Sequence, residues 1–183
     1  LVSDAGTPVI SDPGEIIVKE AIKEEINIVP IPGACALINA LITSGLDTKE
    51  FCFYGFLSLN KKIRKNKLEE IKKENKTIIL YEAPHKLLST LKDLEKILDN
   101  RKIVIARELT KIHEEFLRGT VSEILEKYPE PRGEHIIIIE GNFKKENDEE
   151  NIINDMSVND MYKLYEKEGL SKNEIIKKIA KNK

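Results

Sequence analysis

Short apolar runs bounded by charged or turn-forming residues constrain the fold of this chain most. The longest, Ile136–Ile139 within EHIIIIEG, covers only about four residues, whereas a membrane-spanning helix needs roughly 20. A continuously apolar strand of this kind is typical of the middle of a sheet that is covered on both faces. We therefore expect a soluble α/β protein with no membrane partner.

The composition indicates a globular protein of one or two small domains. The chain has 183 residues, of which 40% are hydrophobic and 34% charged, so it can bury a core. Its 30 basic and 32 acidic residues give a net charge of −2, so any attraction for nucleic acid must come from a local patch. Cys35 and Cys52 lack metal-binding spacing, which favours reduced thiols in a cytoplasmic protein. Leu1 is not an initiator Met, and we expect residues to be missing before it.

Residues 1–46 are predicted to be the remainder of a first α/β domain. The expected elements are the end of a strand at Leu1–Val2, a helix over Pro13–Glu24 with Asp12 as N-cap and Pro13 at N1, a short buried strand over Ile26–Ile31, and a helix over Ala34–Ser44 that stops at Gly45. This alternation of strand and helix favours a parallel sheet with right-handed crossovers.

Residues 47–142 are predicted to be a second α/β domain with a mixed sheet. The expected strands are FCFYGFL, KTIILYEA, RKIVIARE, EEFLRGT and EHIIIIEG, and the expected helices are KNKLEEIKKE, PHKLLSTLKDLEKILD and Val121–Lys127. A polar linker over 143–156 and a small helical tail over 157–183 follow. In the tail we expect two helices separated at Gly169, the second capped by Ser171 with Glu174 completing a capping box.

The opening loop, SDAGTPVISDPG, follows a strand and precedes a helix. This places it at the carboxyl edge of a parallel sheet, where open α/β proteins bind ligands. Gly6 tolerates a positive φ and a close ligand, and Pro8 and Pro13 stiffen the turn. Ordinary turn chemistry is the more common reason for one glycine in such a loop, and the loop is neither GxGxxG nor a P-loop.

Six sequence motifs that occur in a fixed order are more specific than the opening loop alone. They are SDAGTPVISDPG, VPIPGACALINAL, FYGFL, YEAPHKLL, ARELTKIHEEFLRG and GEHIIIIEG. Together, over about Leu1–Gly141, they closely resemble the ribosomal RNA small-subunit methyltransferase I family, in the tetrapyrrole-methylase-like class of S-adenosylmethionine enzymes. The resemblance implies two α/β domains with the cofactor in the cleft between them, and 2′-O-methylation of a cytidine in 16S ribosomal RNA of the small subunit. It also implies a homodimer, and it makes this chain a carboxyl-terminal portion, inactive alone.

The same resemblance implies which residues bind the cofactor. They are Asp4, Ala5, Gly6, Thr7, Pro8, Ile10, Cys35, Ala36, Tyr81, Ala106, His135 and Ile136. Thr7 stands where the wider superfamily has Asp in Gly-Asp-Pro, which argues against a tetrapyrrole substrate.

Methyl transfer to a ribose hydroxyl requires alignment and a proton acceptor, and no metal is expected. The candidates for proton handling and ribose orientation are Glu82, His85, Arg107, Glu108 and Lys111. An Arg–Glu ion pair that only braces the loop is an equal alternative. His85, His113 and His135 are too scattered to predict a zinc site.

A basic run is the candidate RNA surface, on a loop that leads into a helix: Lys61, Lys62, Arg64, Lys65 and Lys67. A solvated helix face explains the run equally well, and the lysines of the closing KNEIIKKIAKNK could extend the basic surface. Two other functions stay open, a non-catalytic binding module and a methylase of a tetrapyrrole-like small molecule.

Overall fold

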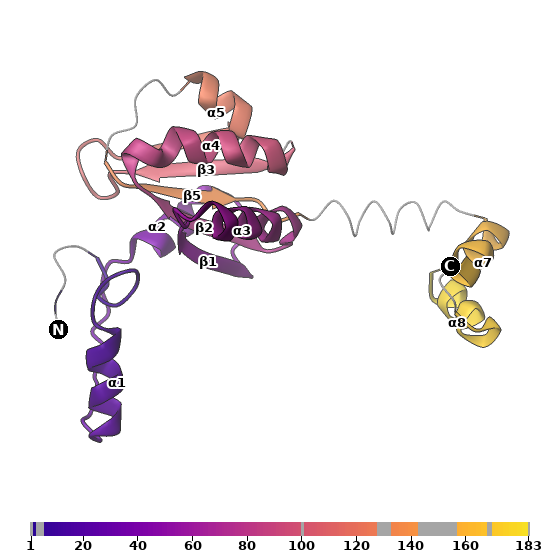
Figure 1. The fold of residues 1–183 in the computed structure, drawn as a ribbon, viewed down its shortest axis with the longest axis horizontal. Coiled ribbons are helices and arrows are strands. Elements are labelled where there is room, and N and C mark those ends of the chain that lie inside the picture. Colours follow the sequence, from indigo (N-terminus) through magenta and orange to yellow (C-terminus); the bar gives the residue numbers. More distant parts are fainter. Residues whose placement is uncertain are drawn as a thin grey trace. The chain divides into compact units, whose positions relative to one another are not determined.

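The computed structural model describes residues 2, 6–99, 101–127, 133–142, 157–167 and 170–182. The chain divides into two compact units, Leu1–Asn142 and Phe143–Lys183 (Figure 1). No helix in these described ranges is both long and apolar enough to cross a bilayer.

The first unit contains five strands and most of the helices. Its described elements are α1 (Glu15–Lys23), α2 (Ala36–Ser44), β1 (Phe51–Phe56), α3 (Lys61–Lys73), β2 (Thr77–Glu82), α4 (Pro84–Leu98), β3 (Lys102–Arg107), β4 (Glu115–Thr120), α5 (Val121–Lys127) and β5 (His135–Ile139). The expected strands from residue 51 onward and the helix over Val121–Lys127 are confirmed.

The five strands form one mixed sheet in the order β1-β2-β5-β3-β4. β1 and β2 are parallel, and the other three neighbouring pairs are antiparallel. β5 is the central strand and all five of its residues are buried. Its continuously apolar sequence therefore has the predicted cause, because both of its faces are covered.

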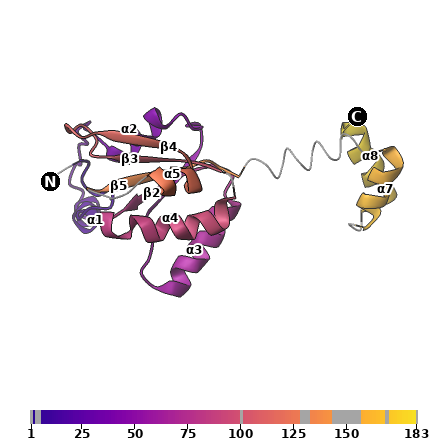
Figure 2. The same ribbon diagram turned by 90° about the horizontal axis from the view of Figure 1, so that it is seen from above.

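Helices pack on both faces of this sheet (Figure 2). On one face, apolar residues of α3, α4 and α5 enclose Ile78, Ile105 and Ile137. On the other, Leu37 and Leu41 of α2 pack against the alternate strand residues. The guanidinium of Arg118 on β4 also donates to the carbonyl of Thr43, at 2.6 Å, and so fixes the end of α2 to the sheet.

Two helix ends follow from local chemistry. α3 begins at Lys61 with Asn60 as its N-cap, whose side-chain oxygen accepts hydrogen bonds from the backbone N–H of Lys62 (3.0 Å) and Ile63 (3.3 Å). α2 ends at Gly45, whose φ of +78° is the left-handed conformation expected after a helix.

Two expectations for the first 46 residues are wrong. α1 begins at Glu15, with Gly14 at its N-cap and no side-chain capping bond, because the φ of 140° at Gly14 breaks the helical path after Asp12 and Pro13. Residues 26–31 form no strand, and their apolar side chains are exposed. A strand needs a neighbouring strand whose backbone N–H and C=O groups pair with its own. No strand in the described ranges pairs with residues 26–31.

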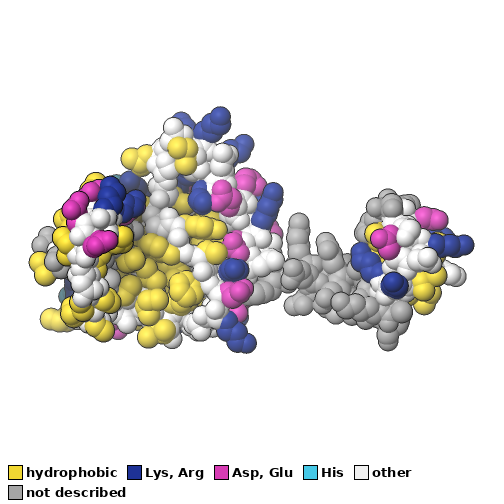
Figure 3. Space-filling model, turned by 90° about the horizontal axis from the view of Figure 1, so that it is seen from below, with side chains coloured by type: hydrophobic (Ala, Val, Ile, Leu, Met, Phe, Trp, Pro, Cys, Tyr) yellow, Lys and Arg dark blue, Asp and Glu magenta, His cyan; other side chains and the backbone are white. Residues whose placement is uncertain are grey.

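Exposed apolar side chains are therefore a feature of this unit (Figure 3). α1 buries none of its residues. Its apolar side chains Ile16 and Ile17 have 77% and 61% of their surface exposed. Such a surface is unusual for an isolated globular protein.

The second unit contains α7 (Val158–Lys167) and α8 (Lys172–Asn182). Among the residues described there, Met161, Tyr165 and Ile175 are buried together. One half of the predicted capping box is confirmed, because the backbone N–H of Ser171 donates to the Glu174 carboxylate at 3.0 Å. The Ser171 hydroxyl donates to the same carboxylate at 2.6 Å. Gly169 and the whole of the expected linker, 143–156, lie outside the described residues.

Candidate functional site

The carboxyl ends of β1, β2 and β3 meet at one edge of the sheet, because these three strands run in the same direction. β5 begins at the same edge, where His135 pairs with Glu82 on one side and with Arg107 on the other. Ligands of open α/β proteins bind beyond this kind of edge.

A cleft of about 840 Å³ lies there. Three groups of residues line it: the opening loop and the start of α2, the strand ends, and the loops after β3 and before β5. They are Val2, Gly6, Thr7, Ile10, Ser11, Asp12, Pro13, Ala34, Cys35, Ala36, Asn39, Phe56, Tyr81, Glu82, Ala106, Arg107, Glu108, Leu109, Thr110, Lys111, Gly133, Glu134, His135 and Ile136.

The cleft brings together most of the residues that the family resemblance implies for binding the cofactor. Those in its lining are Gly6, Thr7, Ile10, Cys35, Ala36, Tyr81, Ala106, His135 and Ile136. Pro8 is not in the lining, and Asp4 and Ala5 lie outside the described residues. Four proposed catalytic residues also line the cleft, namely Glu82, Arg107, Glu108 and Lys111, whereas His85 is exposed on α4 outside it.

The opening loop is held against its neighbours by specific contacts. The Thr7 hydroxyl donates to the carbonyl of Ala34 at 2.9 Å, which joins the loop to the segment before α2. Gly6 has the expected positive φ, +76°. Val9 and Ser11 also have positive φ, and a β-branched residue such as Val9 is strained there.

A row of ionisable side chains crosses four strands at the cleft edge. Pairing places Glu82, His135, Arg107 and Glu115 opposite one another in turn, so their side chains share one face. Arg107 Nε is 2.5 Å from Glu115 Oε2. His135 is buried, and burial, with the nearby Arg107 charge, lowers its pKa from 6.5 to about 4 against the opposing effect of Glu108 and Glu115. His135 is therefore neutral at pH 7.

The loop after β3 carries the other candidate pair. Lys111 Nζ lies 3.2 Å from Glu108 Oε1, and Glu108 has a φ of +50°. A Cβ on Gly133 would lie only 2.2 Å from the same carboxylate oxygen, so the glycine provides the room for Glu108. Arg107 thus forms an Arg–Glu ion pair, of the kind that the alternative interpretation expected, and Lys111 forms a second ion pair that was not expected.

Aromatic side chains form the apolar part near β1. Tyr81 contacts the edges of Phe53 and Phe56, with ring centroids 4.9 and 5.7 Å apart. Burial, with nearby Cys35 and Glu134, raises the pKa of the Tyr81 phenol. Tyr81 is therefore a neutral hydrogen-bonding group at the cleft.

Several lining residues were not predicted. Asn39 lies one helical turn after Cys35, and Phe56 ends β1; both could have been found from the same strand-end and helix-start reasoning. Thr110 has a φ of +67° in the loop after β3, and no sequence pattern marks that conformation in a residue other than Gly, Asn or Asp.

The basic run lies on α3 itself and not on a loop before it, because Asn60 is the N-cap and the helix begins at Lys61, the first residue of the run. Its members differ in their contacts. Arg64 Nη2 is 3.0 Å from Asp93 Oδ2 with its side chain only 17% exposed, and Lys67 pairs with Glu70 and lies 4.3 Å from the Tyr54 ring centroid. Lys61, Lys62 and Lys65 are exposed.

Comparisons with known proteins point to one family. The model of the Tetrapyrrole (Corrin/Porphyrin) Methylases matches residues 1–125. The chain is 48% identical over 182 residues to ribosomal RNA small subunit methyltransferase I of Halalkalibacterium halodurans, and 46% identical over 183 residues to the protein of that name from Bacillus subtilis. Each match covers 98% of this chain and 63% of the relative. A Synechocystis protein of the same name is 51% identical over 77% of this chain and 52% of its own length.

Solved structures share the fold at lower identity. The methyltransferase CobJ superposes with a TM-score of 0.56 at 19% identity, over 75% of this chain and 62% of that one. Uroporphyrin-III C-methyltransferase from Thermus thermophilus, complexed with S-adenosyl homocysteine, gives 0.51 at 15% identity over 74% and 62%. The family match, the mixed five-stranded sheet and the edge cleft agree, and the chain belongs to the tetrapyrrole (corrin/porphyrin) methylase family.

Proposed function

We propose that this chain is the carboxyl-terminal portion of an S-adenosylmethionine-dependent methyltransferase. Its proposed substrate is the 2′-hydroxyl of a cytidine in the 16S RNA of the small ribosomal subunit. The observation that carries the proposal is the identity of 46–51% to relatives named ribosomal RNA small subunit methyltransferase I, over most of this chain.

The residues of the cleft fit S-adenosylmethionine. A volume of about 840 Å³ falls within the range of small-molecule sites. A Cβ on Gly6 would meet nothing within 4 Å, so the space beside this backbone is open to a ligand. Ile10, Tyr81 and Ile136 offer apolar contacts for an adenine ring, and the carboxylates of the cleft offer acceptors for hydroxyl and ammonium groups.

When bound, S-adenosylmethionine supplies a methyl group on a charged sulfur, and its transfer breaks the S–CH₃ bond, forms an O–CH₃ bond and releases the hydroxyl proton. The chain has to align the hydroxyl and accept that proton. Glu108 is the proposed acceptor, with Lys111 beside it at 3.2 Å. Arg107 is proposed to orient the ribose of the substrate. His135, neutral because its pKa is about 4, is suited to hydrogen bonding at the cofactor.

The proposed RNA surface is the exposed face of α3. Lys61, Lys62 and Lys65 extend from this helix into solvent, where they can neutralise phosphates. Lys172 and Lys177 of α8, in the second unit, are exposed as well, and each is proposed as a separate contact for phosphate.

We further propose that the protein is a cytoplasmic homodimer. Exposed apolar side chains on α2 and β1, including Ile42 (64%) and Phe51 (39%), support a protein interface. Analytical ultracentrifugation tests this, and a monomer at micromolar concentration would contradict it.

Methyl transfer tests the proposed function in the complete natural protein that contains residues 1–183. The protein is incubated with small ribosomal subunits and labelled S-adenosylmethionine, and the product is mapped by nuclease digestion and mass spectrometry. We expect one 2′-O-methylcytidine. Label on a tetrapyrrole but not on RNA would favour the small-molecule methylase, and subunit binding without any transfer would favour the non-catalytic module.

A further inference from the structure

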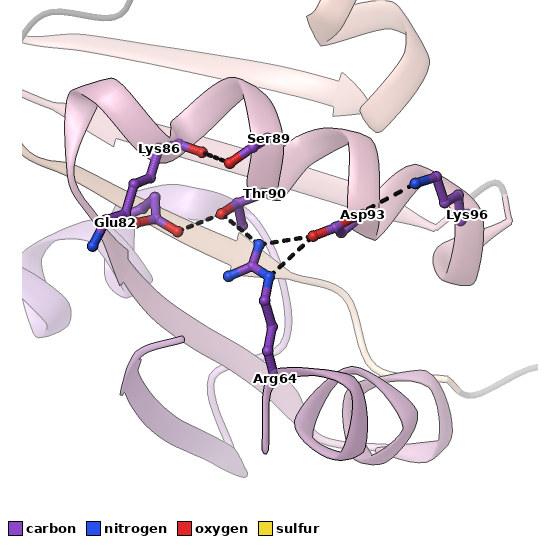
Figure 4. Close-up of polar contacts among 7 residues, drawn as sticks. All are labelled: Arg64, Glu82, Lys86, Ser89, Thr90, Asp93 and Lys96. Carbon is purple, nitrogen blue, oxygen red and sulfur yellow. Dashed lines mark hydrogen bonds and ion pairs between the residues drawn. The ribbon is translucent and has the colours of Figure 1, made fainter. Parts of the chain in front are cut away.

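Glu82 is the buried end of a chain of polar contacts that begins on α3 (Figure 4). Its side chain lines the cleft although the residue is only 3% exposed. Glu82 Oε1 accepts from the backbone N–H of Ala83 at 3.0 Å, and Oε2 accepts from the Thr90 hydroxyl at 2.5 Å. Both carboxylate oxygens are thus fixed by α4 and the residue before it.

The next contact explains why the Thr90 hydroxyl points this way. Arg64 Nη2 lies 3.0 Å from Thr90 Oγ1. A guanidinium can only donate, so the hydroxyl accepts from Arg64, and its single proton is left for Glu82. Thr90 is fully buried, so no water competes for this proton.

Arg64 is itself held in place. Its Nε and Nη2 are each 3.0 Å from Asp93 Oδ2, and Asp93 Oδ1 is 3.6 Å from Lys96. A guanidinium with two neighbours in a fixed geometry is pre-organised. Arg64 therefore differs from the exposed lysines beside it, because its charge is directed into the protein.

Glu82 keeps capacity for a ligand. A carboxylate offers about four lone-pair positions, and the two described bonds use one on each oxygen. The remaining positions are available to a hydrogen-bond donor in the cleft that Glu82 lines.

We propose that Glu82 accepts a hydrogen bond from a hydroxyl or amino group of the adenosyl ligand, and that Arg64, through Thr90, is a positioning residue for it. The identity of the ligand rests on the proposed function. The positioning itself rests only on the Arg64–Thr90–Glu82 contacts.

Calorimetric titration of the complete natural protein with S-adenosylhomocysteine tests the proposal. Thr90→Val, which keeps the shape but not the hydroxyl, should weaken binding about tenfold, the loss of about 1.4 kcal/mol. Thr90→Ser should stay within about threefold of the parent. Ser89→Ala is the matched control, because the Ser89 hydroxyl donates to the carbonyl of Lys86 on the same helix. A second variant, Arg64→Met, removes the donor to Thr90. Its control is Lys73→Met, which removes an exposed positive charge from the same helix.

A double-mutant cycle separates positioning from general stability. If Thr90 acts through Glu82, adding Thr90→Val to Glu82→Gln should weaken binding no further than Glu82→Gln alone. Additive losses, or Thr90→Ser as weak as Thr90→Val, would overturn the proposal.

A measurement without ligand keeps this test distinct from that of the proposed function. The NMR signal of the Ala83 amide, which bonds Glu82 Oε1, should move in Thr90→Val and Arg64→Met and stay in both controls. An unmoved signal overturns the positioning role. A parent protein that binds no S-adenosylhomocysteine overturns the proposed function instead, and the amide signal still decides the role of Arg64.

Discussion

His135 should make the stability of the first unit fall as the solution is acidified. Burial and the Arg107 charge lower the His135 pKa from 6.5 to about 4 in the folded state. Between these two values the unfolded chain binds more protons than the folded one, so the free energy of unfolding decreases as pH falls. The stability is fully present above pH 6.5 and is lost progressively toward pH 4.

The size of this effect follows from the same two values. A shift of one unit corresponds to about 1.4 kcal/mol, and integration from pH 7 to pH 4.5 gives a loss of about 2.5 kcal/mol for this one histidine. The measurement is urea unfolding at pH 7, 5.5 and 4.5 for the parent and for His135→Gln, which cannot titrate.

The difference between the two proteins isolates His135 from the titrating carboxylates. Relative to His135→Gln, the parent should lose about 2.5 kcal/mol over this range. His85→Gln, which removes an exposed histidine on α4, is the matched control. Parallel curves for the parent and His135→Gln would refute the reasoning, because they would mean that the imidazole is as easily protonated folded as unfolded.

Three further results are expected. Gly133→Ala should destabilise the protein by about 2 kcal/mol in denaturant unfolding, because its φ of +74° is strained for a residue with a Cβ and because the Glu108 carboxylate, 2.2 Å from that Cβ, would have to move; an unchanged midpoint would contradict this strain. Glu108→Gln should slow methyl transfer about 100-fold while binding of small subunits is kept, and unchanged turnover would move the proton acceptor elsewhere. Alanine at Lys61, Lys62 and Lys65 together should lower the salt slope of RNA binding by about two units; an unaltered slope would assign these lysines to solvation.

Regular packing was predictable from the sequence, and unpaired segments were not. Apolar runs such as Ile136–Ile139 predicted their strands because the sheet pairs and covers them. The run Ile26–Ile31 has the same local signal, yet it forms no strand and is exposed. Pairing depends on a neighbour that the pattern of the run itself does not contain.

Polar networks were the other limit of prediction. Glu82, Arg107 and Glu108 could be placed at the cleft because strand ends gather at one edge. Thr90 could not, because its position depends on α4 packing beside α3, and its hydroxyl accepts a hydrogen bond from Arg64 of that other helix. Side chains 26 positions apart in the sequence share no local pattern.

The bulge in β1 has a consequence for concentrated solutions. β1 lies at one edge of the sheet, and its register with β2 shifts between Phe53 and Gly55, where Gly55 has a φ of +61°. A straight edge strand is a template onto which another molecule can add its own strand, and so begin aggregation. The bulge bends the strand and leaves only Phe51–Phe53 in regular register before the shift. This glycine thereby protects the open edge against the growth of fibrils.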